Sequence, residues 1–117
     1  MNPMIRIAVA LSCAAFTGSA LAAGNVEEGK KKVEACAACH ATGGDWTKPL
    51  QPEYPKLAGQ HRDYLVTALN AYKSADKSVI GRKNAIMGGQ VAALSRQDIE
   101  NIAAYLASLP GPLHIKR

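Results

Sequence analysis

The stretch Cys36-Ala37-Ala38-Cys39-His40 has the CxxCH spacing through which haem is attached covalently to a polypeptide. Two thiols separated by two residues can add to the two vinyl groups on one side of a porphyrin, and the histidine that follows can place its imidazole below the iron. The motif therefore predicts one haem c, attached through two thioether bonds at Cys36 and Cys39. It also predicts His40 as the first axial ligand of the iron.

Two other kinds of CxxC site fit the rest of the chain less well. A thioredoxin-like pair of thiols requires a βαβ context, which the sequence does not indicate, and it gives His40 no role. A structural zinc site needs further Cys or His ligands at metal spacing. The two remaining histidines, His61 and His114, lie far apart in sequence.

Residues 1–22 have the anatomy of a secretory signal peptide. Arg6 supplies the positive start, residues 7–16 form an apolar run, and Ala20-Leu21-Ala22 is a small-residue cleavage site. The apolar run is shorter than the roughly 20 residues that a membrane-spanning helix needs. We therefore predict export to the periplasm and no transmembrane anchor after removal of the signal.

Cys13 lies inside this apolar run, and it could also be interpreted as the acylation site of a lipoprotein. The preceding leucine is one position away from the usual pattern, and cleavage there would cut the hydrophobic stretch in half. We interpret Cys13 as part of the signal. The predicted organisation is then a signal peptide over residues 1–22 and a single monohaem domain over residues 23–117.

The predicted domain is small, mildly basic and free of structural disulfides, because both of its cysteines belong to the CxxCH motif. A domain of this size with few aromatic residues buries a modest core, which a covalently bound apolar cofactor would enlarge. The formal net charge of the chain is +5, and residues 1–22 contribute one basic residue to it. Such a charge suits docking to an acidic partner or membrane surface, and it does not by itself indicate a nucleic-acid partner.

Hydrophobic periodicity predicts an all-α domain. Apolar residues at helical spacing, with polar residues suited to the ends, indicate three helices, over residues 24–35, 61–73 and 95–109. Three prolines make residues 41–56 an irregular loop, and several glycines make residues 74–89 mainly loop. Ser95 is the expected N-cap of the last helix, with Asp98 completing a capping box.

The second axial ligand decides between electron transfer and ligand chemistry at a haem iron. Met87 is the one methionine outside the signal, and it lies in a glycine-rich stretch rather than an apolar stripe. It is therefore the predicted ligand, with His61 and His114 as alternatives. A His/Met pair stays bound in both oxidation states and favours the reduced iron, as an electron carrier requires.

The order of these elements resembles that of the class I c-type cytochromes. Four stretches more closely resemble one haem domain of the bacterial c-four-type cytochromes c: YPKLAGQ at residues 54–60, YL at 64–65, RKNAIM at 82–87 and LSRQD at 94–98. The resemblance implies a small, all-α cytochrome c fold of three to five helices around one haem. It also implies thioether bonds at the two cysteines and axial ligation by His40 and Met87.

The resemblance assigns further roles near the haem. The carbonyl group of Pro52 or Pro55 would accept the N–H of the proximal imidazole, and Gln60 and Arg82 would approach the haem propionates. Glycine 29 would allow the first and last helices to cross against Tyr105. The chain departs from the family's pattern at Ala41, where glycine is frequent, and within residues 74–80.

The resulting functional prediction is a periplasmic electron-transfer protein rather than an enzyme. Its partners would be redox proteins that dock at the haem edge, including a membrane oxidase or reductase complex. The alternatives are a cytochrome subunit of a periplasmic dehydrogenase complex, and an open-site haem protein that binds a gas or acts as a peroxidase. Five lysines are candidates to surround the haem edge: Lys48, Lys56, Lys73, Lys77 and Lys83.

Overall fold

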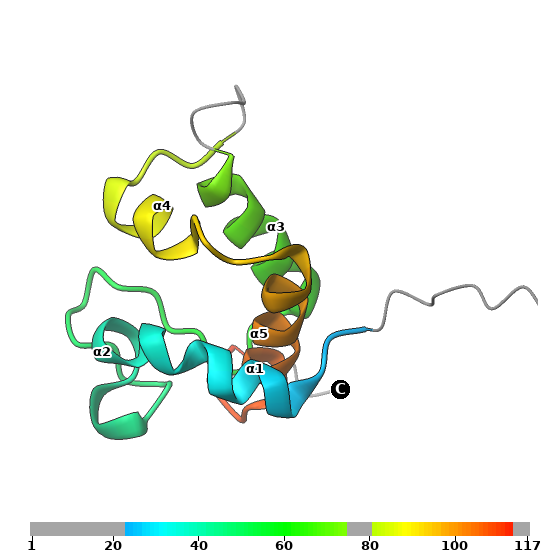
Figure 1. The fold of residues 1–117 in the computed structure, drawn as a ribbon. Coiled ribbons are helices and arrows are strands. Elements are labelled where there is room, and N and C mark those ends of the chain that lie inside the picture. Colours follow the sequence, from blue (N-terminus) through cyan, green and yellow to red (C-terminus); the bar gives the residue numbers. More distant parts are fainter. Residues whose placement is uncertain (1–22, 75–80, 114–117) are drawn as a thin grey trace, which may run out of the picture.

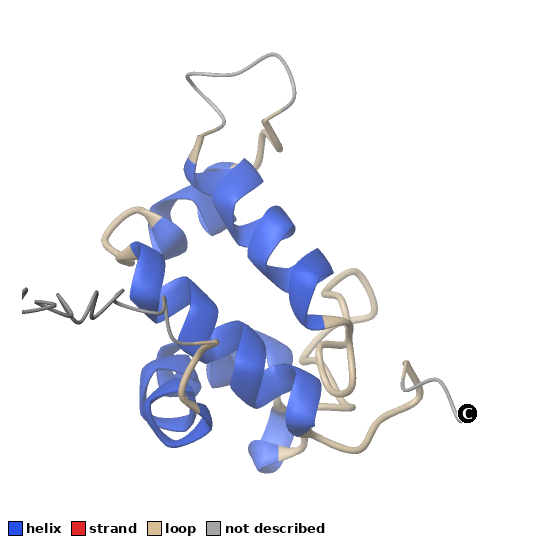
Figure 2. Cartoon of the chain, turned by 90° about the vertical axis from the view of Figure 1, so that its right-hand side faces the viewer, coloured by secondary structure: helices blue, strands red, loops and turns tan. Residues whose placement is uncertain are grey.

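The computed structural model describes residues 23–74 and 81–113, and within these ranges every regular element is helical (Figures 1 and 2). The predicted all-α class is confirmed. The predicted signal peptide, Lys77 and His114 lie outside the described residues. The elements are α1 (Val26–Lys32), η1 (Val33–Cys36), α2 (Ala37–His40), η2 (Thr42–Gly44), α3 (Arg62–Lys73), α4 (Ala85–Val91) and α5 (Arg96–Ser108).

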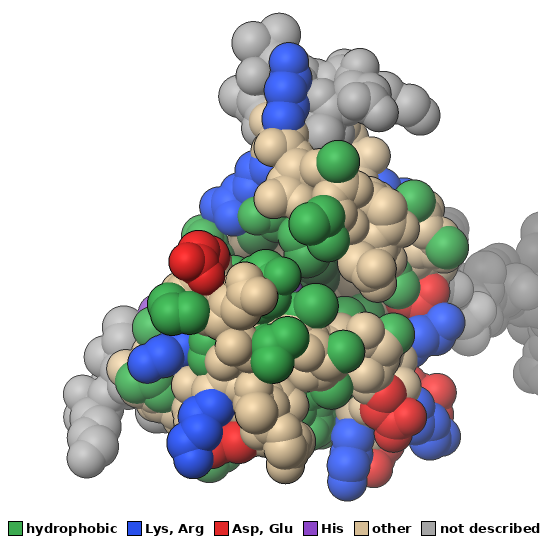
Figure 3. Space-filling view, turned by 90° about the vertical axis from the view of Figure 1, so that its left-hand side faces the viewer, with side chains coloured by type: hydrophobic (Ala, Val, Ile, Leu, Met, Phe, Trp, Pro, Cys, Tyr) green, Lys and Arg blue, Asp and Glu red, His purple; other side chains and the backbone are tan. Residues whose placement is uncertain are grey.

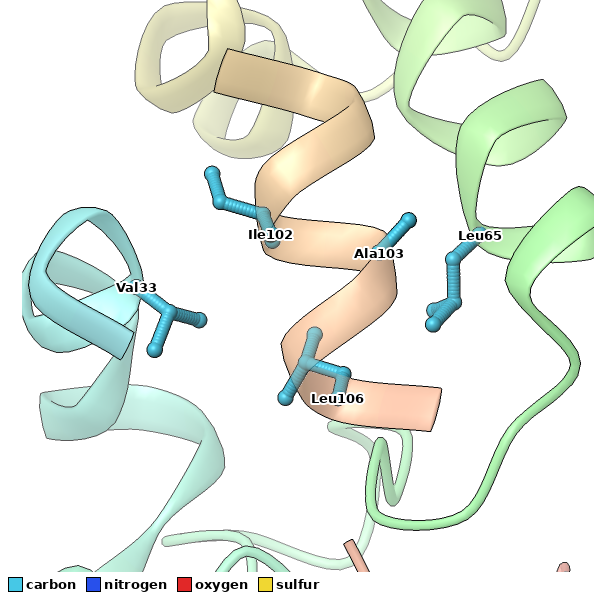
Figure 4. Close-up of a cluster of buried hydrophobic side chains, with 5 residues drawn as sticks. All are labelled: Val33, Leu65, Ile102, Ala103 and Leu106. Atoms are coloured by element: carbon cyan, nitrogen blue, oxygen red, sulfur yellow. The ribbon is translucent and has the colours of Figure 1, made fainter. Parts of the chain in front are cut away.

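Helix α5 lies at the centre of the fold, between α1 on one side and α3 on the other (Figure 1). Its buried side chains meet Val33 and Leu65, which approach α5 from opposite sides (Figure 4). Because a small domain has little apolar area to bury, this one cluster forms the core that aligns the helices. Its five buried members are Val33, Leu65, Ile102, Ala103 and Leu106.

The crossing of α1 over α5 depends on Gly29, as predicted. A Cβ atom at this position would overlap the carbonyl oxygen of Asn101 and lie 2.9 Å from the Cβ atom of Tyr105. Asn101, itself buried, accepts hydrogen bonds through Oδ1 from the Asn25 N–H at 2.7 Å and from the Gln97 side chain at 2.9 Å. Glycine therefore lets two backbones touch where any side chain would separate them.

Capping groups define where the outer helices begin. Asn25 caps α1 by accepting the N–H of Glu28 at 3.0 Å. At α5 the Ser95 hydroxyl accepts the Asp98 N–H at 3.0 Å, and the Asp98 carboxylate accepts the Ser95 N–H at 2.9 Å. This capping box confirms the expected start of the last helix.

Two predicted boundaries were wrong. One helix was predicted over residues 24–35, but α1 ends at Lys32. The tighter turns of η1 and then α2 follow it directly, so helical structure continues to His40. The loop predicted over residues 74–89 contains the start of α4, because Asn84 caps that helix by accepting the Met87 N–H at 2.9 Å. An N-cap and packing against α3 outweigh the poor helix propensity of two glycines.

None of the helices in the described residues is long and apolar enough to cross a membrane.

Candidate haem-binding site

The two cysteines of the CxxCH motif lie on one helical run. Cys36 ends η1, and Cys39 lies in the single turn of α2, so the thiols three positions apart occupy neighbouring places on the same side. Both side chains are half-buried. Burial, and to a lesser extent Cys39, raises the pKa of the Cys36 thiol. Cys36 packs against the core, and both cysteines remain partly exposed, so a group can be attached to them.

His40 ends α2 with its imidazole almost completely enclosed, at 6% exposure. Its Nδ1 atom lies 3.0 Å from the carbonyl oxygen of Pro55. A carbonyl can only accept, so Nδ1 carries the proton and Nε2 keeps the lone pair that an iron ion requires. Of the two prolines considered, Pro55 makes this contact through its carbonyl group.

Tight local hydrogen bonds shape the loop that follows His40. The Leu50 N–H donates to the Cys39 carbonyl at 2.9 Å, and the Thr42 N–H donates to the Lys48 carbonyl at 2.7 Å. The Asp45 carboxylate accepts the hydroxyl and the N–H of Thr47, at 2.6 and 2.9 Å. These bonds fold the loop back beside the second cysteine.

The carboxylate at the centre of this loop gives a testable pH dependence. Hydrogen bonds from Thr47, and the nearby Lys48, lower the pKa of Asp45 from 3.8 to about 2. Because the folded pKa lies below the unfolded one, the carboxylate's contribution to stability is complete above about pH 4 and is lost as the pH falls toward 2. Replacing Thr47 with valine should return the Asp45 pKa toward 3.8.

An NMR titration of the Asp45 side-chain carboxyl carbon measures this shift. Replacing Thr47 with serine is the matched control, because it keeps the hydroxyl and should keep the low pKa. A Thr47→Val protein whose Asp45 still titrates near pH 2 would contradict the assignment of the shift to Thr47.

Met87 is the third residue of α4 and is half-buried. Its helix and α2 lie one above the other on the same side of the molecule (Figure 1). In the space-filling view of that side, hydrophobic side chains gather across the middle of the face and charged side chains lie around its rim (Figure 3). Asn84, which fixes the Met87 N–H, was not singled out from the sequence, although an Asn before an apolar run is an ordinary N-cap signal.

The other predicted site residues have the following surroundings. The Gln60 side chain accepts the N–H of His61 at 2.9 Å, and His61 itself is an exposed N-cap without a side-chain capping bond. The Arg82 guanidinium donates to the Tyr64 hydroxyl at 3.0 Å. Among the predicted lysines that the structure describes, Lys48 pairs with Asp45 and Lys73 donates to the Leu94 carbonyl. All four are exposed: Lys48, Lys56, Lys73 and Lys83.

The donor set suits a haem and does not suit a simple metal ion. In the described part of the chain, no group of three or more His, Cys, Asp and Glu side chains is placed to hold a metal. Leu50, whose N–H donates to the carbonyl of Cys39, is a large apolar side chain that is 57% exposed. An attached porphyrin would bring further apolar surface to this part of the molecule.

The family model for cytochrome c matches residues 26–110, from the start of α1 to two residues past the end of the last helix. The chain belongs to the cytochrome c family. Membership means that it carries covalently bound haem c, for which Cys36 and Cys39 provide the CxxCH thiols.

Similar cytochromes come from several bacteria. Cytochrome c4 of Stutzerimonas stutzeri is 44% identical over 100 residues, covering 82% of this chain and 46% of that protein. Cytochrome c-554(548) of Halomonas halodenitrificans is 38% identical over 86 residues, covering 74% of this chain and 98% of that protein. A thiosulfate dehydrogenase electron acceptor of Stutzerimonas stutzeri is 29% identical over 80 residues, covering 68% of this chain and 35% of that protein.

The fold agrees with that of a solved cytochrome. The crystal structure of reduced recombinant cytochrome c4 from Pseudomonas stutzeri superposes with a TM-score of 0.67 at 41% sequence identity. The match covers 76% of this chain and 47% of that chain. The chain therefore spans about half the length of the cytochrome c4 relatives, and the c-four-type resemblance of the sequence is confirmed.

Proposed function

We propose that this cytochrome c carries single electrons between redox partners in the periplasm, on a haem whose iron is held by His40 and Met87. One observation carries the proposal: the buried imidazole of His40 follows the two cysteines directly and is fixed by the Pro55 carbonyl at 3.0 Å. That hydrogen bond orients the ring and makes Nε2 a better donor to iron. Bound there, the haem supplies a one-electron Fe(III)/Fe(II) couple.

The polypeptide's part in this function is to keep the iron environment unchanged between the two oxidation states. The hydrogen bond from Nδ1 holds one ligand, and the Asn84 cap fixes the backbone of the other. A pair of fixed ligands limits the rearrangement that accompanies gain or loss of an electron. The core around α5 also packs against Cys36, so the haem-attachment segment is held to the centre of the fold.

Optical spectra of the purified holoprotein test the ligand pair. The oxidised protein should show the weak sulfur-to-iron absorption band, and the reduced protein should bind carbon monoxide poorly because no axial position is open. Ready binding of carbon monoxide to the native reduced protein, without the sulfur band, would instead support the open-site gas-binding or peroxidase function.

A second candidate function is that of a cytochrome subunit in a periplasmic dehydrogenase complex. The relative named as a thiosulfate dehydrogenase electron acceptor favours this possibility, because its name describes a protein that receives electrons from a dehydrogenase. Both functions use the same haem site and differ in how long the partner stays bound. Co-purification of a dehydrogenase with the native protein at physiological salt would support the subunit role.

Docking would take place on the face where hydrophobic side chains are bordered by charged ones (Figure 3). We propose that a redox partner approaches this face, guided by the positive charge of the chain. Lys56 and Lys83 are the better candidates for steering, because the charge of Lys48 is already paired with Asp45.

A further inference from the structure

Arg82 lies against two tyrosine side chains of α3. Its guanidinium carbon is 5.4 Å from the centre of the Tyr64 ring and 5.5 Å from the centre of the Tyr72 ring. Nη2 also donates a hydrogen bond to the Tyr64 hydroxyl at 3.0 Å. A planar cation with several donors can stack on aromatic faces and hydrogen-bond at the same time, which a lysine cannot reproduce in full.

The backbone at Arg82 is attached to the same helix. The Arg82 N–H donates to the carbonyl of Ala71 in α3 at 3.0 Å. Two residues later Asn84 caps the start of α4, and its side chain accepts the N–H of Met87. Helix α3 therefore holds the backbone of Arg82, and the Asn84 cap two residues later holds the backbone of Met87, the proposed iron ligand.

Contacts farther along also connect α4 to α3. The Lys73 ammonium at the end of α3 donates to the Leu94 carbonyl in the turn that follows α4. An added Cβ atom at Gly88 would lie 3.8 Å from the Tyr72 carbonyl oxygen, so the two helices pass close to each other. Helix α4 has seven residues, too few for a helix to be stable by itself, so its position depends on these tertiary contacts.

We propose that Arg82 is a positioning residue that fastens the start of α4 to Tyr64 and Tyr72 and thereby keeps the Met87 sulfur on the iron. The inference rests on the proposed His/Met ligation and gives Arg82 a role other than contact with a haem propionate. A loosened start of α4 lets the methionine leave the iron more often, and an added ligand then binds more readily.

Titration of the oxidised holoprotein with imidazole measures how often the methionine leaves. Imidazole competes with Met87 for the iron, and loss of the sulfur-to-iron band reports its binding. We expect Arg82→Ala to tighten the apparent imidazole affinity by about tenfold, because a cation–π contact and a hydrogen bond are lost. Arg82→Lys keeps the charge and should give an intermediate affinity.

Lys83→Ala is the matched control, because it removes one positive charge from the neighbouring, exposed position. Its imidazole affinity should stay within about twofold of the native value, since no hydrogen bond or ion pair joins Lys83 to the described residues. An equal effect of Lys83→Ala and Arg82→Ala would mean that net charge, not the tyrosine contacts, controls the methionine, and would overturn the proposal.

A double-mutant comparison separates this role from propionate binding. If Arg82 acts through the tyrosines, Arg82→Ala should add little once Tyr64 and Tyr72 are both replaced by leucine. If Arg82 acts through a propionate, its replacement should have the same effect with and without the tyrosines, and that result would overturn the proposal. Unchanged imidazole affinity in Arg82→Ala would overturn it as well.

Amide hydrogen exchange distinguishes failure of this inference from failure of the proposed ligation. The Met87 amide donates to Asn84, so faster exchange at Met87 in Arg82→Ala reports a loosened helix start whichever group binds the iron. Absence of the sulfur band from the native protein would reject Met87 as ligand. Native exchange at Met87 in Arg82→Ala would reject Arg82 as the fastening residue.

Discussion

Replacing Met87 with alanine should abolish the sulfur-to-iron band of the oxidised protein and let carbon monoxide bind the reduced iron. The substitution removes the sulfur and opens one axial position, while Asn84 can still accept the N–H at residue 87. The reduction potential should fall by on the order of 0.1 V, within the range of about 0.8 V over which axial ligands set haem potentials. Spectra and a redox titration of the purified variant measure both effects.

Ile86→Ala is the appropriate control, because Ile86 precedes Met87 on the same helix and is 65% exposed. It should keep the sulfur band and bind carbon monoxide as poorly as the native protein. A sulfur band that survives in Met87→Ala would show that the proposed ligand is wrong. The histidines at 61 and 114 would then be replaced in turn to find the sixth ligand.

Replacing Gly29 with alanine should cause a large loss of stability. The new Cβ atom would overlap the Asn101 carbonyl oxygen and crowd Tyr105, so α1 must move away from α5. Overpacking of this kind costs about 1–3 kcal/mol, and we expect the upper end because backbone atoms, rather than a flexible side chain, are in the way. Urea unfolding of the holoprotein, followed by far-UV circular dichroism, gives the free energy.

Lys30→Ala supplies the control for this measurement, because it leaves an alanine at the next position of α1, where the side chain is exposed. Its free energy of unfolding should change by no more than about 0.5 kcal/mol, as for most surface substitutions. A Gly29→Ala protein as stable as Lys30→Ala would show that α1 and α5 can separate slightly without loss, and that the close crossing is not required.

Most of the fold could be predicted because its signals are local. The apolar stripe that contains Ile102 and Leu106, the Ser95 capping box and the CxxCH motif each lie within a few turns of helix. The structure confirms the all-α class and the crossing at Gly29. Local patterns of this kind carry enough information because helix caps and helix periodicity depend on neighbours in sequence.

The parts that could not be predicted depend on contacts between distant residues. Glycines at 88 and 89 lower helix propensity, so the local pattern indicated a loop, whereas packing against α3 stabilises α4. Sequence patterns also left Pro52 and Pro55 equivalent, and only the folded loop selects Pro55. The contact of Arg82 with two tyrosines joins residues up to 18 positions apart, and no spacing rule predicts it.

The central place of α5 has a consequence for the order of events during biosynthesis. Helix α5 is the last helix of the described chain, yet its side chains form the middle of the core that supports Val33 and the cysteine-bearing turn. A chain made from its N-terminus therefore has no core to bury that turn until the final helix has been synthesised. The thiols stay accessible during this interval, so haem can be attached before the protein closes around it.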